Sequence, residues 1–186
     1  NDLPKPSKPD AAPLSAKSIK NIHGVLHKAL KQAVLIGYLR TNPTEACILP
    51  RIIRKEMHPL EEDQVAVFLR EVQGHPHEYL YKIALFTGLR EGEVLGLGWE
   101  HIDFQAGTLT VKRQLRREQK KGGEYYFSPP KNNKSRCLTL APSVIQLFRL
   151  QKLEQNSMRM EAGDAWEEHG LIFTNQTGGY LSYRTV

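Results

Sequence analysis

Apolar residues recur at three- and four-residue steps through residues 15–37, and this spacing predicts a long amphipathic helix. Ser15 is a suitable N-cap, and Gly37 is a suitable residue to end the helix. We expect the apolar stripe to be buried in a core. The stripe consists of Ile19, Ile22, Leu26, Ala29, Leu30, Ala33 and Val34.

The helical period continues after a proline-containing linker at residues 50–59. It predicts helices at residues 60–72 and 77–86, and acidic residues open the first of them. Thr87-Gly88 interrupts the second helix, and a short helix is expected to resume through residues 91–97.

The period then changes from 3.6 to 2, which predicts strands at residues 108–111, 125–127 and 136–140. Turns are expected at Gly122-Gly123 and Asn132-Asn133, so the strands should form a three-stranded antiparallel meander. A helix at residues 143–160 and a short strand at 171–173 should follow. The predicted fold class is α+β, mostly α, in two parts at residues 1–54 and 55–186.

Composition excludes several classes of protein. Hydrophobic residues make up 40% and charged residues 25% of the 186 residues, which argues against disorder and collagen-like structure. Two cysteines and no Cys-x-x-Cys pair argue against a disulfide framework or a zinc site, so we expect a cytoplasmic protein. No apolar run is long enough to cross a bilayer. The chain starts at Asn1 rather than Met, and we expect it to be an excerpt of a longer protein.

Charge is distributed in blocks. The formal net charge is +6, yet residues 112–136 hold nine Lys or Arg against two Asp or Glu, and residues 57–111 hold three against nine. Residues 1–56 are also basic. Basic blocks on both sides of an acidic one suit a protein that binds a polyanion through selected surfaces. Solvated lysine-rich faces explain the charge pattern equally well.

The segment at residues 86–103 holds the most informative chemistry. The glycine break puts Arg90 at the start of a short helix, and Glu93 lies on the same helical face. A carboxylate in this position can hold the guanidinium in one pose, and a fixed guanidinium can bind a phosphate through two parallel hydrogen bonds. From spacing alone, a surface Arg–Glu pair beside a glycine bend is the simpler interpretation.

This segment resembles the first arginine box of the tyrosine recombinases, the phage and transposon integrase family. Their pattern is Thr-Gly-Leu-Arg, one residue, Gly-Glu, then a Leu-x-Leu-x-Trp run that ends in Ile-Asp. Every position is matched between Thr87 and Asp103. Residues 14–50 are similar to the end of the family's helical core-binding domain and its linker, and residues 60–65 to the first helix of its catalytic domain. Residues 130–136 resemble the lysine-bearing hairpin turn.

The resemblance implies a DNA transesterification that uses no metal and no cofactor and passes through a 3′-phosphotyrosine. It implies that Arg90 stabilises charge on the non-bridging phosphate oxygens and that Glu93 supports Arg90. Lys131 matches the hairpin lysine that protonates the leaving 5′-oxygen. Lys134 is the competing assignment, because the length of the turn is open.

The resemblance also implies double-stranded DNA as the partner, with further copies of the recombinase and accessory DNA-bending or directionality factors. The contacts should be chiefly to phosphates, which position a protein without specifying sequence. The basic run that begins at Lys112 is the strongest candidate, and a solvated loop is its alternative. The candidate DNA-binding residues are Lys17, Lys20, Lys28, Arg51, Arg54, Lys112, Arg113, Arg116 and Arg117.

The family's second catalytic cluster, a His-x-x-Arg followed by the nucleophilic tyrosine, does not occur in these residues. Tyr180 and Tyr183 precede the place where it should begin, so we assign them to packing. We therefore expect this polypeptide to bind DNA without cleaving it. The alternative is a non-catalytic DNA-binding or regulatory module derived from an integrase; a topoisomerase IB-like relative fits the first box less well.

Other candidate residues have ordinary structural interpretations. His23 and His27 are spaced for a shared metal but lack a third ligand, so we expect surface or packing roles. Trp99 should anchor the core. The aromatic run at residues 125–127 could stack on DNA bases, and alternating burial in a strand explains it at least as well.

Overall fold

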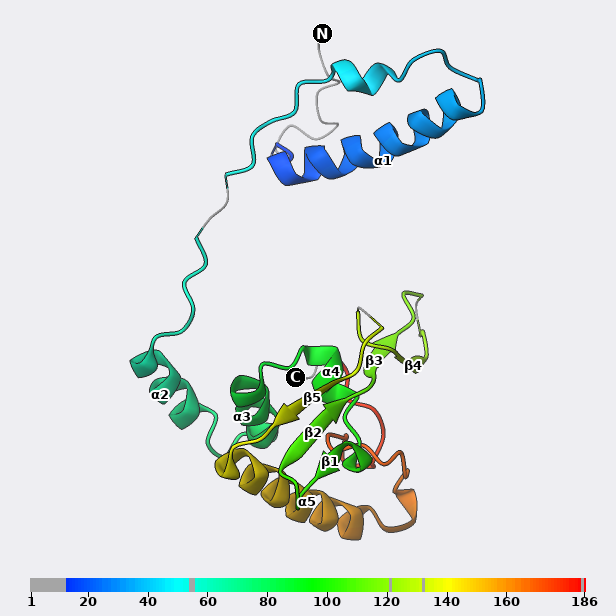
Figure 1. The fold of residues 1–186 in the computed structure, drawn as a ribbon. Coiled ribbons are helices and arrows are strands. Elements are labelled where there is room, and N and C mark those ends of the chain that lie inside the picture. Colours follow the sequence, from blue (N-terminus) through cyan, green and yellow to red (C-terminus); the bar gives the residue numbers. More distant parts are fainter. Residues whose placement is uncertain (1–12, 54–55, 121, 132, 185) are drawn as a thin grey trace. The chain divides into compact units, whose positions relative to one another are not determined.

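The computed structural model describes residues 13–53, 56–120, 122–131, 133–184 and 186. The chain forms two compact units, Asn1–Pro59 and Leu60–Val186 (Figure 1). The boundary predicted at residues 54 and 55 lies outside the described residues. No helix in the described ranges is long and apolar enough to cross a membrane.

The first unit contains the helix α1 (Ala16–Leu35) and the short 3₁₀ helix η1 (Pro43–Ala46). Ser15 caps α1 as predicted, because its side chain accepts a hydrogen bond from the Ser18 N–H. His23 and His27 connect the two helices: their ring nitrogens lie 3.0 and 2.9 Å from the carbonyl and hydroxyl oxygens of Thr44. The two histidines therefore have a packing role.

The prediction that the apolar stripe of α1 is buried is wrong for this chain. No residue of α1 is buried, and Ile22 and Leu26 are 59% and 49% exposed. Among the described elements of its unit, α1 packs against η1, and the side-chain hydrogen bonds to Thr44 of η1 come from the two histidines.

The second unit contains four α-helices among its described residues, and their positions agree with the sequence pattern. They are α2 (Glu62–Glu71), α3 (Glu78–Thr87), α4 (Glu91–Leu95) and α5 (Pro142–Ala162). Short 3₁₀ turns follow α4 and α5, at Trp99–His101 and Gly163–Ala165. Helix α5 packs along α3, on one side of the unit (Figure 1).

The strands pair differently from the predicted meander. A three-stranded antiparallel sheet has the order β1-β2-β5, with β1 at Ile102–Asp103, β2 at Thr108–Val111 and β5 at Arg136–Thr139. The aromatic strand β4 (Tyr125–Ser128) belongs instead to a separate hairpin with β3 (Gln114–Arg117). Strand β3 was not predicted from the sequence. Its only buried residue, Leu115, is followed by two arginines, so the strand does not show a clear alternation of apolar and polar residues.

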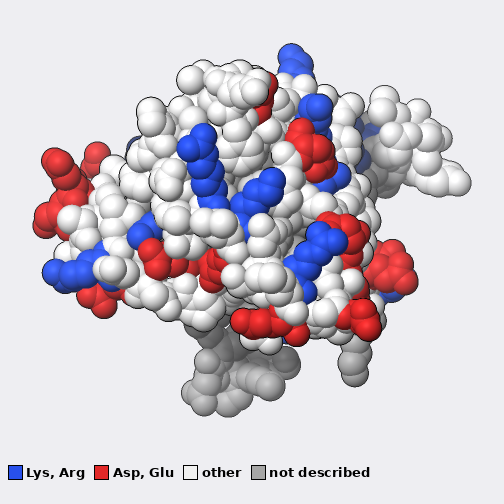
Figure 2. Space-filling view, turned by 90° about the horizontal axis from the view of Figure 1, so that it is seen from below, with Lys and Arg blue, Asp and Glu red and all other residues white. Residues whose placement is uncertain are grey.

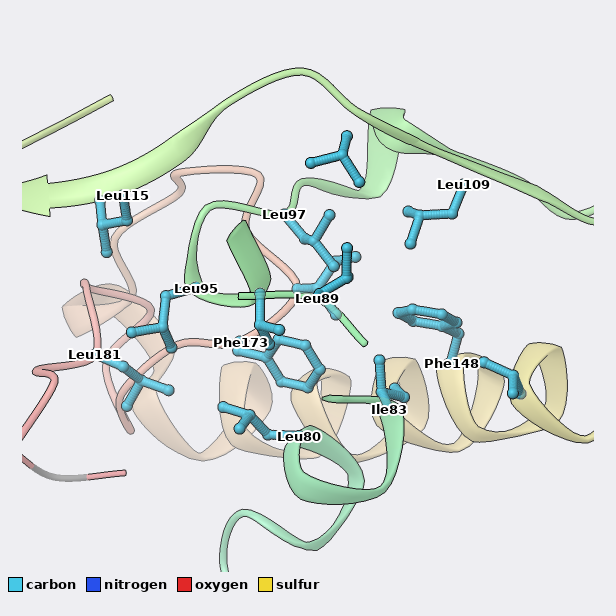
Figure 3. Packing of buried hydrophobic residues seen from close by; sticks show 14 of the residues in the cluster. Leu80, Ile83, Leu89, Leu95, Leu97, Leu109, Leu115, Phe148, Phe173 and Leu181 are labelled. Carbon is cyan, nitrogen blue, oxygen red and sulfur yellow. The ribbon is translucent and has the colours of Figure 1, made fainter. Parts of the chain in front are cut away.

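Residues 171–173, predicted as a strand, form only an isolated bridge to Gly98. They are nevertheless buried, and they complete the core of the second unit. Figure 3 shows Phe148 of α5 beside Ile83 of α3, both fully buried. Leu97 and Leu109 enclose the same core from the sheet side. Trp99 anchors this core as predicted, because it packs against it and its indole N–H donates to Gln155 Oε1 at 2.8 Å.

The close approach of α4 to β3 gives a test of this packing. A Cβ atom on Gly96 would lie 2.7 Å from the backbone nitrogen of Leu115, and a backbone atom cannot rotate away. We expect Gly96→Ala to lower the free energy of unfolding by about 2 kcal/mol, the typical cost of overpacking. Urea unfolding followed by tryptophan fluorescence measures this change.

Gly24→Ala is the control, because a Cβ atom there meets nothing within 4 Å and alanine favours the helix. An equal loss of stability in both variants would contradict the packing of α4 on β3.

Candidate active site

Arg90 stands between two helices. Helix α3 ends at Gly88, whose φ of 61° is the left-handed conformation that glycine tolerates best. Arg90 follows in an extended conformation and is the N-cap of α4. The break predicted from the sequence therefore puts Arg90 at the start of a short helix, and its side chain is 63% exposed.

Glu93 holds Arg90 through both backbone and side chain. Its Oε2 accepts from the Arg90 backbone N–H at 2.9 Å, and its Oε1 accepts from Arg90 Nη1 at 3.1 Å. The Glu93 side chain is only 1% exposed. The alternative of a surface Arg–Glu pair is therefore wrong, because the carboxylate lies beneath an exposed guanidinium.

A second arginine, which the sequence analysis did not select, reaches the same carboxylate. Arg136, the first residue of β5, donates from Nη1 to Glu93 Oε1 at 2.9 Å and from Nη2 to Oε2 at 2.7 Å. The pair spans 43 residues in sequence. The only signal in the sequence was a charged residue at the start of an apolar strand, and that signal does not identify its partner.

The two guanidinium groups determine the ionisation of Glu93. The hydrogen bonds from Arg136 lower the pKa of this carboxyl most, followed by those from the backbone and side chain of Arg90. Burial acts in the opposite direction, and the resulting pKa is about 2 instead of 4.5. Glu93 is therefore a carboxylate throughout the physiological pH range, and in turn it raises the pKa of Arg136.

An open hollow of about 620 Å³ lies beside this cluster. Four cationic side chains line it, two from the Glu93 cluster and two from the turn before β5. The lining residues are Gly88, Arg90, Pro130, Lys131, Lys134, Ser135 and Arg136. Both lysines suggested by the sequence thus share one hollow with Arg90. Neither has an ion-pair partner among the described residues.

The side of the molecule on which α5 lies has no such excess of one charge. Figure 2 views the molecule from the side on which α5 lies, and acidic and basic side chains are interspersed there. Within the described residues, no group of three or more His, Cys, Asp or Glu is placed to hold a metal ion. The arginines and lysines that line the hollow present hydrogen-bond donors and positive charge, which suit an anion.

Two of the candidate DNA-binding arginines also have partners within the chain. Arg113 donates from Nε to the Gly96 carbonyl, pairs with Glu100 at 3.0 Å, and lies over the Phe127 ring. Arg117 donates to the Gly123 carbonyl and lies over Tyr125. The side chains of Lys112 and Arg116 are exposed.

The candidates of the first unit are also accessible. Lys17, Lys28 and Arg51 are exposed, and Lys20 is half-buried. Arg54 lies outside the described residues, as does Asn132 of the lysine-bearing turn.

The late tyrosines pack, as the sequence analysis proposed. Tyr180 stacks on Tyr125 and meets Phe127 edge to face. The Tyr183 hydroxyl donates to the Leu115 carbonyl. Tyr125 and Phe127 therefore contact another ring of the unit, although Phe127 remains 37% exposed and Tyr126 44% exposed.

The second unit is thus a mixed α/β fold in which a buried carboxylate lies behind two arginines, beside a lysine-bearing turn. The model of the "Phage integrase family" matches residues 58–186, and the chain belongs to this family.

The chain is also similar to two curated relatives. It is 28% identical over 183 residues to a "Tyrosine recombinase XerC-like" protein of Caldanaerobacter subterraneus subsp. tengcongensis, covering 90% of this chain and 47% of the relative. It is 29% identical over 184 residues to an integrase of Streptomyces ambofaciens, covering 95% of this chain and 46% of the relative. The chain thus spans about half the length of these relatives.

Solved structures share the fold. The Tn1549 transposon integrase in complex with a circular intermediate DNA is 25% identical, with a TM-score of 0.73 over 91% of this chain and 55% of that one. A lambda integrase dimer bound to a COC′ core site is 20% identical, with a TM-score of 0.56, covering 91% of this chain and 42% of that one.

Proposed function

We propose that the whole protein is a site-specific DNA recombinase that cuts and rejoins strands through a 3′-phosphotyrosine, and that residues 88–136 supply half of its phosphate site. The observation that carries this proposal is the hollow, in which Arg90, Lys131 and Lys134 converge. The two curated relatives are a tyrosine recombinase-like protein and an integrase, and the Tn1549 neighbour holds DNA.

Arg90 has the role of stabilising charge. One of its five N–H donors is used by Glu93, and the others have no partner among the described residues. When a nucleophile attacks phosphorus, negative charge grows on the non-bridging oxygens. A guanidinium already fixed toward them stabilises that charge without reorganising.

The lysine turn has the role of proton donor. Lys131 and Lys134 both border the hollow, and either ammonium can protonate the 5′-oxygen as it leaves phosphorus. We retain Lys131 as the first choice and Lys134 as the alternative. The exposed Lys112 and Arg116 would contact the duplex backbone, and further copies of the protein would bind the second duplex.

The first unit has the role of a second DNA clamp in this proposal. We assign residues 1–54 to the end of a helical core-binding domain and residues 55–186 to part of the catalytic domain. The exposed Lys17, Lys28 and Arg51 suit contacts with phosphates.

Duplex binding by this chain should depend steeply on salt. Each phosphate contact adds a slope of about −0.9 in a plot of log affinity against log salt, so four contacts give roughly a 100-fold loss between 50 and 200 mM. The double variant Lys131→Gln/Lys134→Gln should reduce the slope by about 1.8. Fluorescence anisotropy with a labelled duplex measures both values.

Arg149→Gln on α5 is the matched control, because this exposed arginine does not line the hollow and its loss should leave the slope unchanged. Affinity that stays flat with salt, or an equal change in the control, would argue against phosphate binding at the hollow.

A further inference from the structure

Arg136 has a geometric relation to Glu93 that Arg90 does not have. Its two terminal nitrogens meet both carboxylate oxygens, at 2.9 and 2.7 Å, whereas the Arg90 side chain makes a single bond of 3.1 Å. A bidentate pair fixes the plane of the carboxylate as well as its position. The orientation of Glu93 is therefore determined by β5 as well as by its own helix.

This geometry also determines which arginine the carboxylate neutralises. One carboxylate carries one negative charge, and the two shorter, paired bonds go to Arg136. The Arg136 side chain is 36% exposed and the Arg90 side chain 63% exposed. Arg90 is therefore the less neutralised and more exposed of the two arginines, and four of its five N–H donors have no partner among the described residues.

Arg136 also connects the two segments that line the hollow, the Arg90 segment and the lysine-bearing turn. Arg90 precedes α4, while Lys131 and Lys134 lie in the turn that runs directly into Arg136. Strand β5 is paired with β2, where Val111 is opposite Arg136. The ion pair with Glu93 thus connects the lysine turn to the Arg90 segment through one buried carboxylate.

A direct contact between Arg136 and the anion is the alternative role. Two of the five N–H donors of Arg136 bind Glu93, and the pair of Nη atoms that forms this fork cannot turn to a phosphate without releasing the buried carboxylate. Removing the partner of a buried charge is costly, because it leaves that charge without compensation. The geometry therefore favours an indirect role.

We propose that Arg136 is a positioning residue: it orients and neutralises Glu93, so that Arg90 meets the phosphate as a rigid cation beside the lysine turn. This inference rests on the proposed function and adds to it a residue that acts through Arg90 and not on the substrate.

A double-mutant cycle tests this inference in the whole protein. Arg136→Gln should slow single-turnover strand cleavage about 10- to 100-fold, because small misplacement of a catalytic group has effects of this size. Duplex affinity should change by less than about threefold. In an Arg90→Ala background the same substitution should change cleavage by less than about twofold, since residues that act as a unit are not additive.

Arg136→Lys separates charge from geometry. The lysine ammonium keeps the positive charge but cannot form two parallel hydrogen bonds with the carboxylate. We therefore expect Arg136→Lys to cleave faster than Arg136→Gln but about 10-fold more slowly than the wild type. This variant also tests the proposal if Arg136→Gln does not fold. Arg159→Gln is the matched control: it breaks the exposed ion pair with Glu168, does not touch the hollow, and should leave cleavage unchanged.

A binding measurement tests the inference independently of cleavage. We expect the Arg90 guanidinium signals in a ¹⁵N–¹H spectrum of the chain to shift when inorganic phosphate is added, and Arg136→Gln or Arg136→Lys to weaken that response about 3- to 10-fold.

The possible outcomes are distinct. If the wild-type protein does not cleave DNA, or Arg90→Ala cleaves normally, the proposed function fails. If Arg90→Ala is impaired but Arg136→Gln and Arg136→Lys cleave like wild type, or their loss is the same with and without Arg90, the positioning role is overturned. An unchanged Arg90 phosphate response in both Arg136 variants also overturns it.

Discussion

Arg90→Ala is expected to reduce strand cleavage by the whole protein about 1,000-fold and to weaken duplex binding by no more than about threefold. The guanidinium contributes little to ground-state binding, because several other cations contact the same duplex. Its fixed donors matter when charge develops on the phosphate oxygens. Single-turnover cleavage of a nicked duplex and anisotropy titrations separate the two effects.

Arg116→Ala is the informative control for this substitution. Arg116 is an exposed arginine on β3 that does not line the hollow. Its loss should affect binding and cleavage to the same small extent. If Arg90→Ala also lowered both quantities equally, Arg90 would be a docking residue and not part of the catalytic site.

Glu93→Gln is expected to lower the free energy of unfolding by about 2–4 kcal/mol at pH 7. The amide has no charge to neutralise two guanidinium groups, and its NH₂ replaces one of two oxygens that each accept two hydrogen bonds. At least one arginine donor therefore meets another donor. Urea unfolding of both proteins measures the difference.

The pH dependence of this difference follows from the lowered pKa of Glu93. A carboxyl whose pKa falls from 4.5 to about 2 on folding stabilises the protein fully above pH 4.5 and loses that contribution as the pH falls toward 2. Glu93→Gln removes the contribution, so the gap between variant and wild type should be large at pH 7 and smaller at pH 3.

Glu91→Gln is the control for the pH measurement, since Glu91 is an exposed carboxyl of the same helix. It should change stability by less than about 0.5 kcal/mol at either pH. A Glu93→Gln gap that does not depend on pH would contradict the ion-pair cluster.

The helices could be predicted because their signals, the spacing of apolar residues and the capping residues, lie within a short stretch of sequence. Ser15 and Gly88 lie at the helix ends expected for them, and the four helices of the second unit lie within a few residues of their predicted limits. The pairing of strands is not local information. Strand β3 has Arg117 two residues after the buried Leu115, where alternation would place an apolar residue, so β3 was not predicted and its partner β4 was assigned to the sheet.

The candidate site was predictable only in part, for the same reason. Glu93 follows Arg90 by three residues, so a helical spacing was enough to join them. Arg136 is 43 residues from Glu93 in the sequence. The two residues meet only because strand β5, which begins at Arg136, packs beside Glu93 of α4, and the sequence does not show this contact. The sequence also gave no reason to expect that Arg113 and Arg117 stack on aromatic rings of their own hairpin.

The central claim is that the hollow beside Arg90 holds a DNA phosphate, and a crystal structure of the protein with a short duplex tests it most directly. We expect a phosphate oxygen about 2.7–3.2 Å from the Arg90 guanidinium, with Lys131 or Lys134 on the same phosphate and the Arg136–Glu93 pair intact behind it. A duplex bound on another face, with the hollow open to solvent, would contradict the account.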